Sequence, residues 1–305
     1  MNKNILKCEK INKSFGKKNI LKDVSFEINE GDILGFIGPN GSGKTTTIKC
    51  ILGLNKIDSG KVTINNYDIV NDFENAISKV GAIVENPDSY MYLSGYQNLK
   101  LIANMYGNVS KEKILEKVKF VKLENRINDK VSKYSLGMRQ RLGIAAALIN
   151  EPSLLILDEP TNGLDPEGIK ELRELLKYLA KEKNLGILIS SHNLAELESF
   201  CNKVCIIKDG VVLETTDIES LKKEEINKEY LFEIDDTNKI NNIFDKNINY
   251  RIISNKTFRI AATYDDIPNI VKKLVNNNIN IFEVKELKLS LEEAFLNKTG
   301  GKNND

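Results

Sequence analysis

Hydrophobic positions near the start of the chain recur with period two, which is typical of β-strands that bury one face. Residues 5–30 predict two such strands, joined by a turn at 16–19. The next apolar run, 33–38, is continuous, as in a strand buried on both faces, and it leads directly into a glycine-rich loop. Beyond this loop the pattern predicts a helix at 45–53, a hairpin at 59–69 and a strand at 79–86.

Between residues 90 and 150 the hydrophobic period changes to that of α-helices, which the pattern places at 95–107, 110–123 and 137–150. Two more apolar strands follow at 153–160 and 186–192, with an amphipathic helix at 166–183 between them. Asp165 is the expected N-cap of that helix and Pro166 its first residue. Strands that alternate with helices predict a mainly parallel sheet with helices on both faces, here with a helical subdomain inserted at about 88–150.

A polar run at 221–229 is the predicted linker between an N-terminal domain, 1–220, and a C-terminal domain, 230–305. The later elements are expected in the order strand, helix, strand, strand, helix, strand, which fits a small α+β unit of ferredoxin-like order. The predicted ranges are 230–234, 237–245, 250–254, 257–262, 265–277 and 279–287, and a short helix at 290–298 follows.

Charge and composition narrow the functional classes. The chain has 44 Lys and Arg against 43 Asp and Glu, so its net charge of +1 does not favour a general nucleic-acid binder. No apolar run approaches the ~20 residues that span a bilayer, and charges interrupt the apolar stretches of the N-terminus, unlike a secretory signal. We therefore expect a soluble cytoplasmic chain that reaches a membrane only through a partner. One histidine and four scattered cysteines do not form a zinc pattern.

The most specific motif is GPNGSGKT at 38–45, which matches the phosphate-binding pattern G-x-x-x-x-G-K-[ST] between a predicted strand and a predicted helix. Glycines let backbone N–H groups surround phosphate oxygens, and a helix N-terminus adds partial positive charge. Lys44 would neutralise the terminal phosphates of a nucleotide, and the Thr45 hydroxyl would bind Mg²⁺. The alternative is a plain glycine turn with an exposed lysine. The candidate phosphate-binding residues are Gly38, Pro39, Asn40, Gly41, Ser42, Gly43, Lys44, Thr45 and Thr46.

A second motif, LLILDEP at 154–160, places Asp158 at the carboxyl end of an apolar strand. In a parallel sheet this end lies beside the phosphate loop, so Asp158 would hold Mg²⁺ through water. Glu159 would reach the attacking water as a general base, a role worth ~10²–10⁴-fold in rate. Adjacent carboxylates repel each other and persist most easily where a cation offsets their charge.

These motifs together resemble the ATPase subunit of ABC transporters, over roughly residues 1–220. The resemblance implies an α/β fold: a P-loop NTPase core with a mainly parallel sheet, an N-terminal antiparallel β subdomain and a helical signature subdomain. It also implies ATP and Mg²⁺ as ligands. In that family an aromatic residue ahead of the phosphate loop stacks on adenine, which implies this role for Phe15. The alternative for Phe15 is a core residue at a strand end.

The family's signature loop, LSGGQ, opens a helix, and YSLGM stands in its place at 134–138. Ser135 and Gly137 match the family's phosphate-contacting pair, whereas Leu136 and Met138 depart from the pattern. Asp165 matches the loop that couples two ATP sites, and His192 matches the switch histidine that contacts the γ-phosphate. Taken singly, Ser135 and Gly137 could simply start a helix, and His192 could be structural.

Glu85 stands where the family usually has a glutamine. A carboxylate there would bind Mg²⁺ more tightly and compete with Glu159 for it. ABC subunits of the bacitracin-resistance and lantibiotic-immunity type share this glutamate, the YSLGM variant and a C-terminal extension, so the chain most resembles that subgroup.

The resemblance implies an ATPase that works as a head-to-tail dimer, either a homodimer or a heterodimer with a second ATPase subunit. Each ATP would lie between Lys44 of one chain and Ser135 of the other. Separate transmembrane permease subunits would hold the dimer at the cytoplasmic face of the membrane, where it would power export of, or immunity to, an antimicrobial peptide or drug. The alternatives are export of a lipid, ion or polysaccharide, or action on ribosomes or DNA. A single phosphate loop in 305 residues argues against the last, and no nucleic-acid partner is expected.

Overall fold

The computed structural model describes residues 3–85, 88–107, 109–191, 193–223, 228–244 and 250–287. Contacts divide the chain into two compact units, Met1–Ile218 and Glu219–Asp305. In the part that the structure describes, no helix is both long enough and apolar enough to span a membrane.

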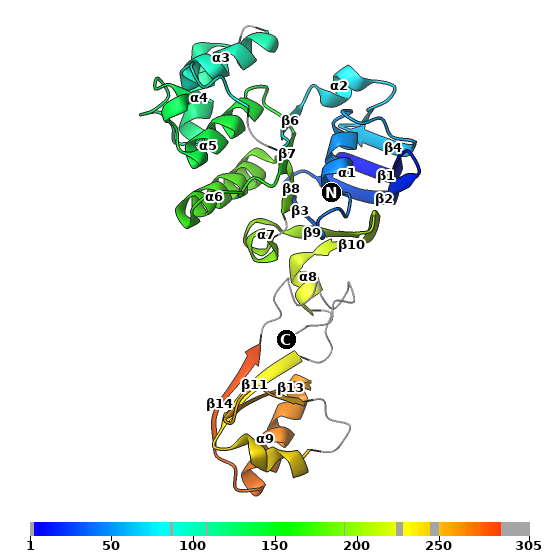
Figure 1. Cartoon of the computed structure of the whole chain (residues 1–305), viewed down its shortest axis with the longest axis vertical. Coiled ribbons are helices and arrows are strands. Elements are labelled where there is room, and N and C mark those ends of the chain that lie inside the picture. Colours follow the sequence, from blue (N-terminus) through cyan, green and yellow to red (C-terminus); the bar gives the residue numbers. More distant parts are fainter. Residues whose placement is uncertain are drawn as a thin grey trace. The chain divides into compact units, whose positions relative to one another are not determined.

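A six-stranded sheet lies at the centre of the first unit, in the order β10-β9-β3-β8-β7-β6 (Figure 1). Neighbouring strands are parallel except for β10, which is antiparallel to β9. Every residue of β3, β7 and β8 is buried, as the continuous apolar runs predicted. The strands are β3 (Ile33–Ile37), β6 (Val80–Ile83), β7 (Leu154–Asp158), β8 (Gly186–Ser191), β9 (Lys203–Lys208) and β10 (Val211–Asp217).

A second, antiparallel sheet has the order β2-β1-β4-β5. Its strands are β1 (Asn4–Phe15), β2 (Lys18–Asn29), β4 (Ser59–Ile64) and β5 (Tyr67–Asp68). The apolar faces of this sheet, of β3 and of α1 (Lys44–Ile51) form one buried cluster, in which the rings of Phe26 and Phe36 lie 5.3 Å apart. The two sheets therefore share a core that fixes the position of α1 and of the loop before it.

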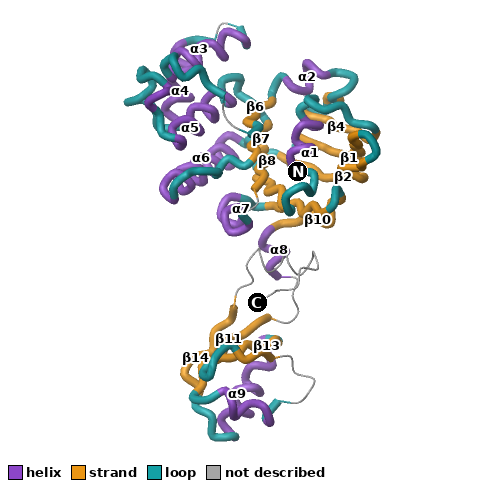
Figure 2. Tube along the Cα trace, viewed as in Figure 1, coloured by secondary structure: helices purple, strands orange, loops and turns teal. Residues whose placement is uncertain are grey.

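Helices surround the central sheet, and one group forms a separate helical subdomain (Figure 2). This subdomain contains α3 (Gly95–Met105), α4 (Lys111–Phe120), the 3₁₀ turn Val131–Lys133 and α5 (Leu136–Ala147). A serine side chain caps the start of each of its three α-helices, as the sequence pattern favours. The other helices of the unit are α2 (Phe73–Ile77), α6 (Pro166–Lys183) and α7 (Leu194–Phe200). Helix α8 (Ile218–Lys223) begins at the last residue of this unit, and its other residues belong to the second.

The second unit contains a four-stranded antiparallel sheet of order β12-β13-β11-β14, which is the ferredoxin-like order. Its elements are β11 (Lys228–Ile234), the 3₁₀ helix Thr237–Asn242, β12 (Tyr250–Ile252), β13 (Thr257–Ala262), the 3₁₀ turn Tyr264–Asp266, α9 (Ile267–Asn276) and β14 (Ile281–Leu287). The predicted helix at 237–245 is a 3₁₀ helix because this asparagine-rich segment has low α-helical propensity. The predicted linker overlaps α8 and β11, and the predicted helix at 290–298 lies outside the described residues.

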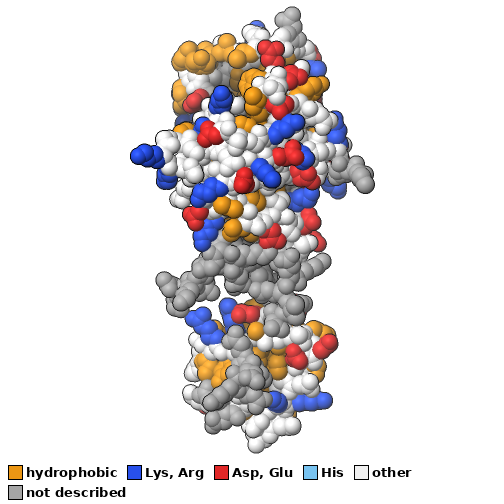
Figure 3. Space-filling view, turned by 90° about the vertical axis from the view of Figure 1, so that its right-hand side faces the viewer, with side chains coloured by type: hydrophobic (Ala, Val, Ile, Leu, Met, Phe, Trp, Pro, Cys, Tyr) orange, Lys and Arg blue, Asp and Glu red, His pale blue; other side chains and the backbone are white. Residues whose placement is uncertain are grey.

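The surface charge agrees with the near-zero net charge. Figure 3 shows one face of the molecule, where basic and acidic side chains alternate over the first unit and do not separate by sign.

The buried face of the second unit's sheet offers a test of its packing. The rings of Phe232 and Phe258 stack 5.1 Å apart, and both side chains are fully buried. Phe258→Ala is expected to destabilise this unit by about 3–5 kcal/mol, because it leaves a cavity. Hydrogen–deuterium exchange of β11 and β13 measures the loss. Phe282→Ala is the matched control, since its ring is 67% exposed, and equal acceleration by both variants would contradict this packing.

Candidate functional site

The phosphate loop connects β3 to α1, as the sequence predicted. Gly41 and Gly43 adopt φ angles of 79° and 109°, in a region that side chains rarely allow. A Cβ atom at Gly38 would lie 2.2 Å from the carbonyl oxygen of Ile207 in β9. Glycine is therefore needed at Gly38 for space and at the other two positions for backbone conformation.

Lys44 opens α1 and points back into this loop. Its ammonium donates hydrogen bonds to the carbonyl oxygens of Gly38, at 2.7 Å, and Pro39, at 3.4 Å. Burial lowers the pKa of Lys44, while the negative charges of Glu159 and Asp158 act in the opposite direction. The loop thus holds a buried cation close to two carboxylates.

The hydroxyl of Ser42 is the observation that best fits a phosphate ligand. Ser42 is 3% exposed, and its Oγ atom is buried without a hydrogen-bond partner. A buried polar group without a partner costs about 1–3 kcal/mol, so a phosphate oxygen in this loop would satisfy it. Thr45 and Thr46, half-buried at the start of α1, lie beside Lys44.

Asp158 is the last residue of β7 and pairs in register with Ser190 of β8. The Ser190 hydroxyl donates a hydrogen bond to the Asp158 carboxylate, which is 3% exposed. Glu159 follows with φ 51°, and its backbone N–H donates to the Ser190 Oγ atom at 3.0 Å. Ser190 thus orients both acidic residues; the sequence signal for it was a pair of serines at the end of an apolar strand.

Glu85 follows the neighbouring strand, β6, also with positive φ, 66°. Its carboxylate forms an ion pair with the ammonium of Lys49 at 2.8 Å, and this hydrogen bond and charge lower the pKa of Glu85. Lys49 lies on α1, and no motif in the sequence indicated it. Among the described residues, no group of three or more His, Cys, Asp and Glu side chains is gathered to hold a metal by itself.

Phe15 ends β1 with 52% of its surface exposed, so the alternative of a core residue does not hold. The Lys13 ammonium lies 5.2 Å from the centre of its ring. An exposed aromatic ring leaves a face open to stacking; contact with adenine stays a prediction. His192 lies outside the described residues.

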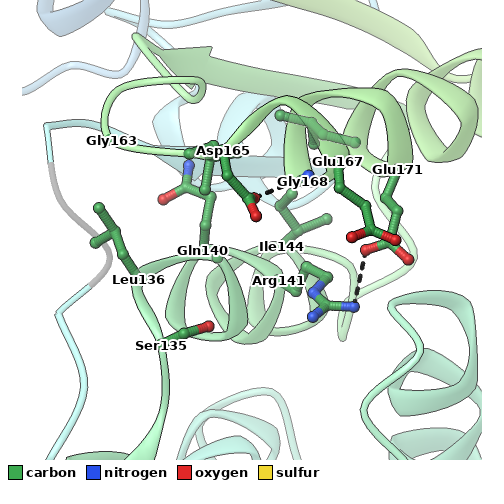
Figure 4. Close-up of a pocket in the computed structure, with 13 residues that line it drawn as sticks. Ser135, Leu136, Gln140, Arg141, Ile144, Gly163, Asp165, Glu167, Gly168 and Glu171 are labelled. Atoms are coloured by element: carbon green, nitrogen blue, oxygen red, sulfur yellow. Dashed lines mark hydrogen bonds and ion pairs between the residues drawn. The ribbon is translucent and has the colours of Figure 1, made fainter.

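The remaining predicted residues line a different cavity, of about 430 Å³, between the N-terminal halves of α5 and α6 (Figure 4). The Ser135 hydroxyl accepts a hydrogen bond from the backbone N–H of Met138, so Ser135 does start a helix. Asp165 caps α6 by accepting from Gly168, at 3.0 Å. Gly137 also lines the cavity, but among the described residues around it none comes from the phosphate loop. In Figure 1, α1 and α5 lie on opposite sides of β7 and β8.

Leu136, the departure from the signature pattern, packs against the loop before α6. A Cβ atom at Gly163 would lie 2.4 Å from the Leu136 Cδ2 atom, so glycine there makes room for the leucine. Figure 4 shows these two residues at the same end of the cavity. The variant side chain therefore joins the signature loop to the loop that carries Asp165.

Known proteins resemble this chain in sequence and in fold. The ABC transporter family matches residues 21–162. The bacitracin transport ATP-binding protein BcrA of Bacillus licheniformis is 38% identical over 97% of this chain and 98% of its own length. The lantibiotic transport ATP-binding protein SrtF of Streptococcus pyogenes is 42% identical over 75% of this chain and 99% of its own. The dimeric structure of the ABC transporter cassette MJ0796 matches with a TM-score of 0.64 and 28% identity, over 70% of this chain and 99% of that one.

The chain therefore belongs to the ATP-binding subunits of ABC transporters. It is an ATPase whose fold is a P-loop NTPase core with the subdomains described above.

Gly163→Ala tests the contact between Leu136 and the loop. We expect it to destabilise the protein by about 0.5–1 kcal/mol more than Gly107→Ala, because both positions have positive φ but a Cβ at Gly163 would also push the Leu136 side chain out of its rotamer. Chemical unfolding followed by circular dichroism measures both losses. Adding Leu136→Ala is expected to remove the excess, and equal losses in the two single variants would contradict the contact.

Proposed function

We propose that residues 38–46 bind the phosphates of ATP, with Lys44 as the neutralising cation. The unpartnered hydroxyl of Ser42 carries this proposal, because it is a buried hydrogen-bonding group that a phosphate would satisfy. The N-terminus of α1 adds its partial positive charge to the same place. Phe15 is the proposed stacking partner of adenine, and His192 the proposed contact of the γ-phosphate.

Mg²⁺ is the proposed cofactor, held by the hydroxyl of Thr45, by Asp158 and by Glu85. These oxygen groups suit its preference, and it would supply charge that offsets the phosphates. Glu159 is the proposed general base. The hydrogen bond from its backbone N–H to Ser190 holds the main chain of Glu159 in place, and this fixes the point from which its side chain extends.

The active form is proposed to be a dimer. Ser135, Gly137 and Asp165 surround a cavity that includes no described residue of the phosphate loop, so one chain offers two incomplete half-sites. A head-to-tail pair would place the N-terminus of α5 of one copy against the ATP of the other. The related cassette MJ0796 has been solved as a dimer, which supports this arrangement.

A groove of about 640 Å³ is the proposed contact for a transmembrane permease subunit. Apolar side chains from the turn after α1 and from α2, β6, α3 and α5 line it, and the exposed fraction is 65% for Leu54 and 83% for Met105. Such exposed apolar side chains around a groove are typical of a protein-binding surface. This contact would place the ATPase at the cytoplasmic face of a membrane.

Export of, or immunity to, a peptide antibiotic is the proposed biological role. A relative named for bacitracin transport matches over 97% of this chain, and one named for lantibiotic transport matches over 75%. The antibiotic susceptibility of cells that carry this chain with its permease tests this role. Resistance is expected with the intact chain and not with a Lys44→Ala chain.

Lys44→Ala is expected to lower ATP affinity at least tenfold, because it removes the buried cation of the phosphate loop. Isothermal titration with ATP measures the change. Lys181→Ala, at an exposed position of α6, is the control and is expected to bind like the parent chain. Unchanged affinity in Lys44→Ala would contradict the assignment of this loop.

Glu159→Gln is expected to retain ATP binding and to lose about 10²–10⁴-fold in turnover, because the amide does not accept a proton from water. ATP should then hold the dimer closed, which light scattering after size-exclusion chromatography detects. Glu182→Gln, on the exposed end of α6, should keep both turnover and the parent's oligomeric state. Normal turnover by Glu159→Gln would remove Glu159 as the base.

A further inference from the structure

The ion pair between Lys49 and Glu85 joins α1, which begins at the phosphate loop, to the segment that follows β6. Glu85 follows β6 and Lys49 lies in the last turn of α1. Their charged atoms are 2.8 Å apart, although the residues are separated by 36 positions. The side chain of Lys49 is 33% exposed and that of Glu85 67%, so the pair is open to solvent and its partners can separate.

Lys49 shares a face of α1 with Thr45. Residues four apart on a helix lie one above the other, so Lys49 is one turn beyond the hydroxyl proposed to hold Mg²⁺. The Glu85 carboxylate is thus held by the residue of α1 that lies one turn beyond Thr45, on the same face of the helix.

Several negative charges lie at this edge of the sheet, and the ion pair with Lys49 offsets one of them. Asp158 and Glu159 stand at the carboxyl end of β7, and Glu85 follows the neighbouring strand β6. Carboxylates gathered in one place repel each other. The charges of Asp158 and Glu159 act on the ammonium of Lys44, whereas the Glu85 carboxylate is paired with the ammonium of Lys49. The left-handed backbone of Glu85, costly for a residue with a Cβ, adds to the need for a partner that holds it.

We propose that Lys49 is a positioning residue for Glu85: its ammonium holds the Glu85 carboxylate along α1 and competes for it with the divalent cation of bound nucleotide. This inference rests on the proposed function of the site. The divalent cation then has to displace Lys49 before it binds the Glu85 carboxylate. Until then the Lys49 ammonium balances the charge of Glu85, which explains how a third carboxylate is accommodated next to Asp158 and Glu159.

The binding of Mn²⁺ to the full chain, loaded with a slowly hydrolysed ATP analogue, tests the competition by electron paramagnetic resonance. Lys49→Met is expected to tighten Mn²⁺ binding about two- to five-fold, which corresponds to the strength of an exposed ion pair. Lys49→Arg, which keeps the charge, is expected to restore the parent affinity. Lys7→Met is the control, because it breaks an equally short exposed ion pair, with Glu9 on β1, away from the site.

The same substitution in a Glu85→Gln background separates pairing from a general effect of charge. Lys49→Met is expected to change Mn²⁺ affinity less than about 1.5-fold there, since the carboxylate that Lys49 holds is gone. Unchanged or weaker binding by Lys49→Met, or an equal change in both backgrounds, would overturn this inference alone. A parent chain that binds no Mn²⁺ with the analogue would overturn the proposed function as well.

Discussion

The pairing of β7 with β8 is the interaction on which the candidate site depends. Its register sets Asp158 opposite Ser190, whose hydroxyl binds that carboxylate and whose Oγ also receives the backbone N–H of Glu159. Because β3, β6, β7 and β8 run in the same direction, their carboxyl ends meet at one edge of the sheet. The phosphate loop and the acidic residues are close together for this reason.

Two acidic residues at that edge have backbone conformations that side chains disfavour. Glu85 and Glu159 follow adjacent parallel strands, and both have positive φ angles. Such strain costs about 1–2 kcal/mol per residue and persists where other contacts hold it. Ser190 holds the backbone of Glu159, while Lys49 holds the side chain of Glu85. The main chain of Glu159 is therefore fixed, whereas the Glu85 carboxylate can exchange Lys49 for another cation.

Helix α5 links the two surfaces through which the proposed dimer and permease would act. Ser135 at its start and Ile144 further along face the cavity beside α6, whereas Leu142 and Ala146 line the apolar groove. A rigid helix that contacts both surfaces moves them together. Changes at the nucleotide end of α5 would therefore reach the groove without any rearrangement inside the helix.

The sequence by itself determined the buried strands, the phosphate loop and the capped helices, because each depends on local periodicity or on one short motif. It also indicated the ferredoxin-like order, but not α2, α7, α8, β9 or β10, and it predicted an α-helix where Thr237–Asn242 is a 3₁₀ helix. Only the tertiary structure decided that Ser190 meets Asp158, that Lys49 meets Glu85, that Leu136 packs against Gly163, and that Phe15 is exposed. Those contacts join residues from separate elements, and sheet register and helix packing, which no short stretch of sequence encodes, bring them together.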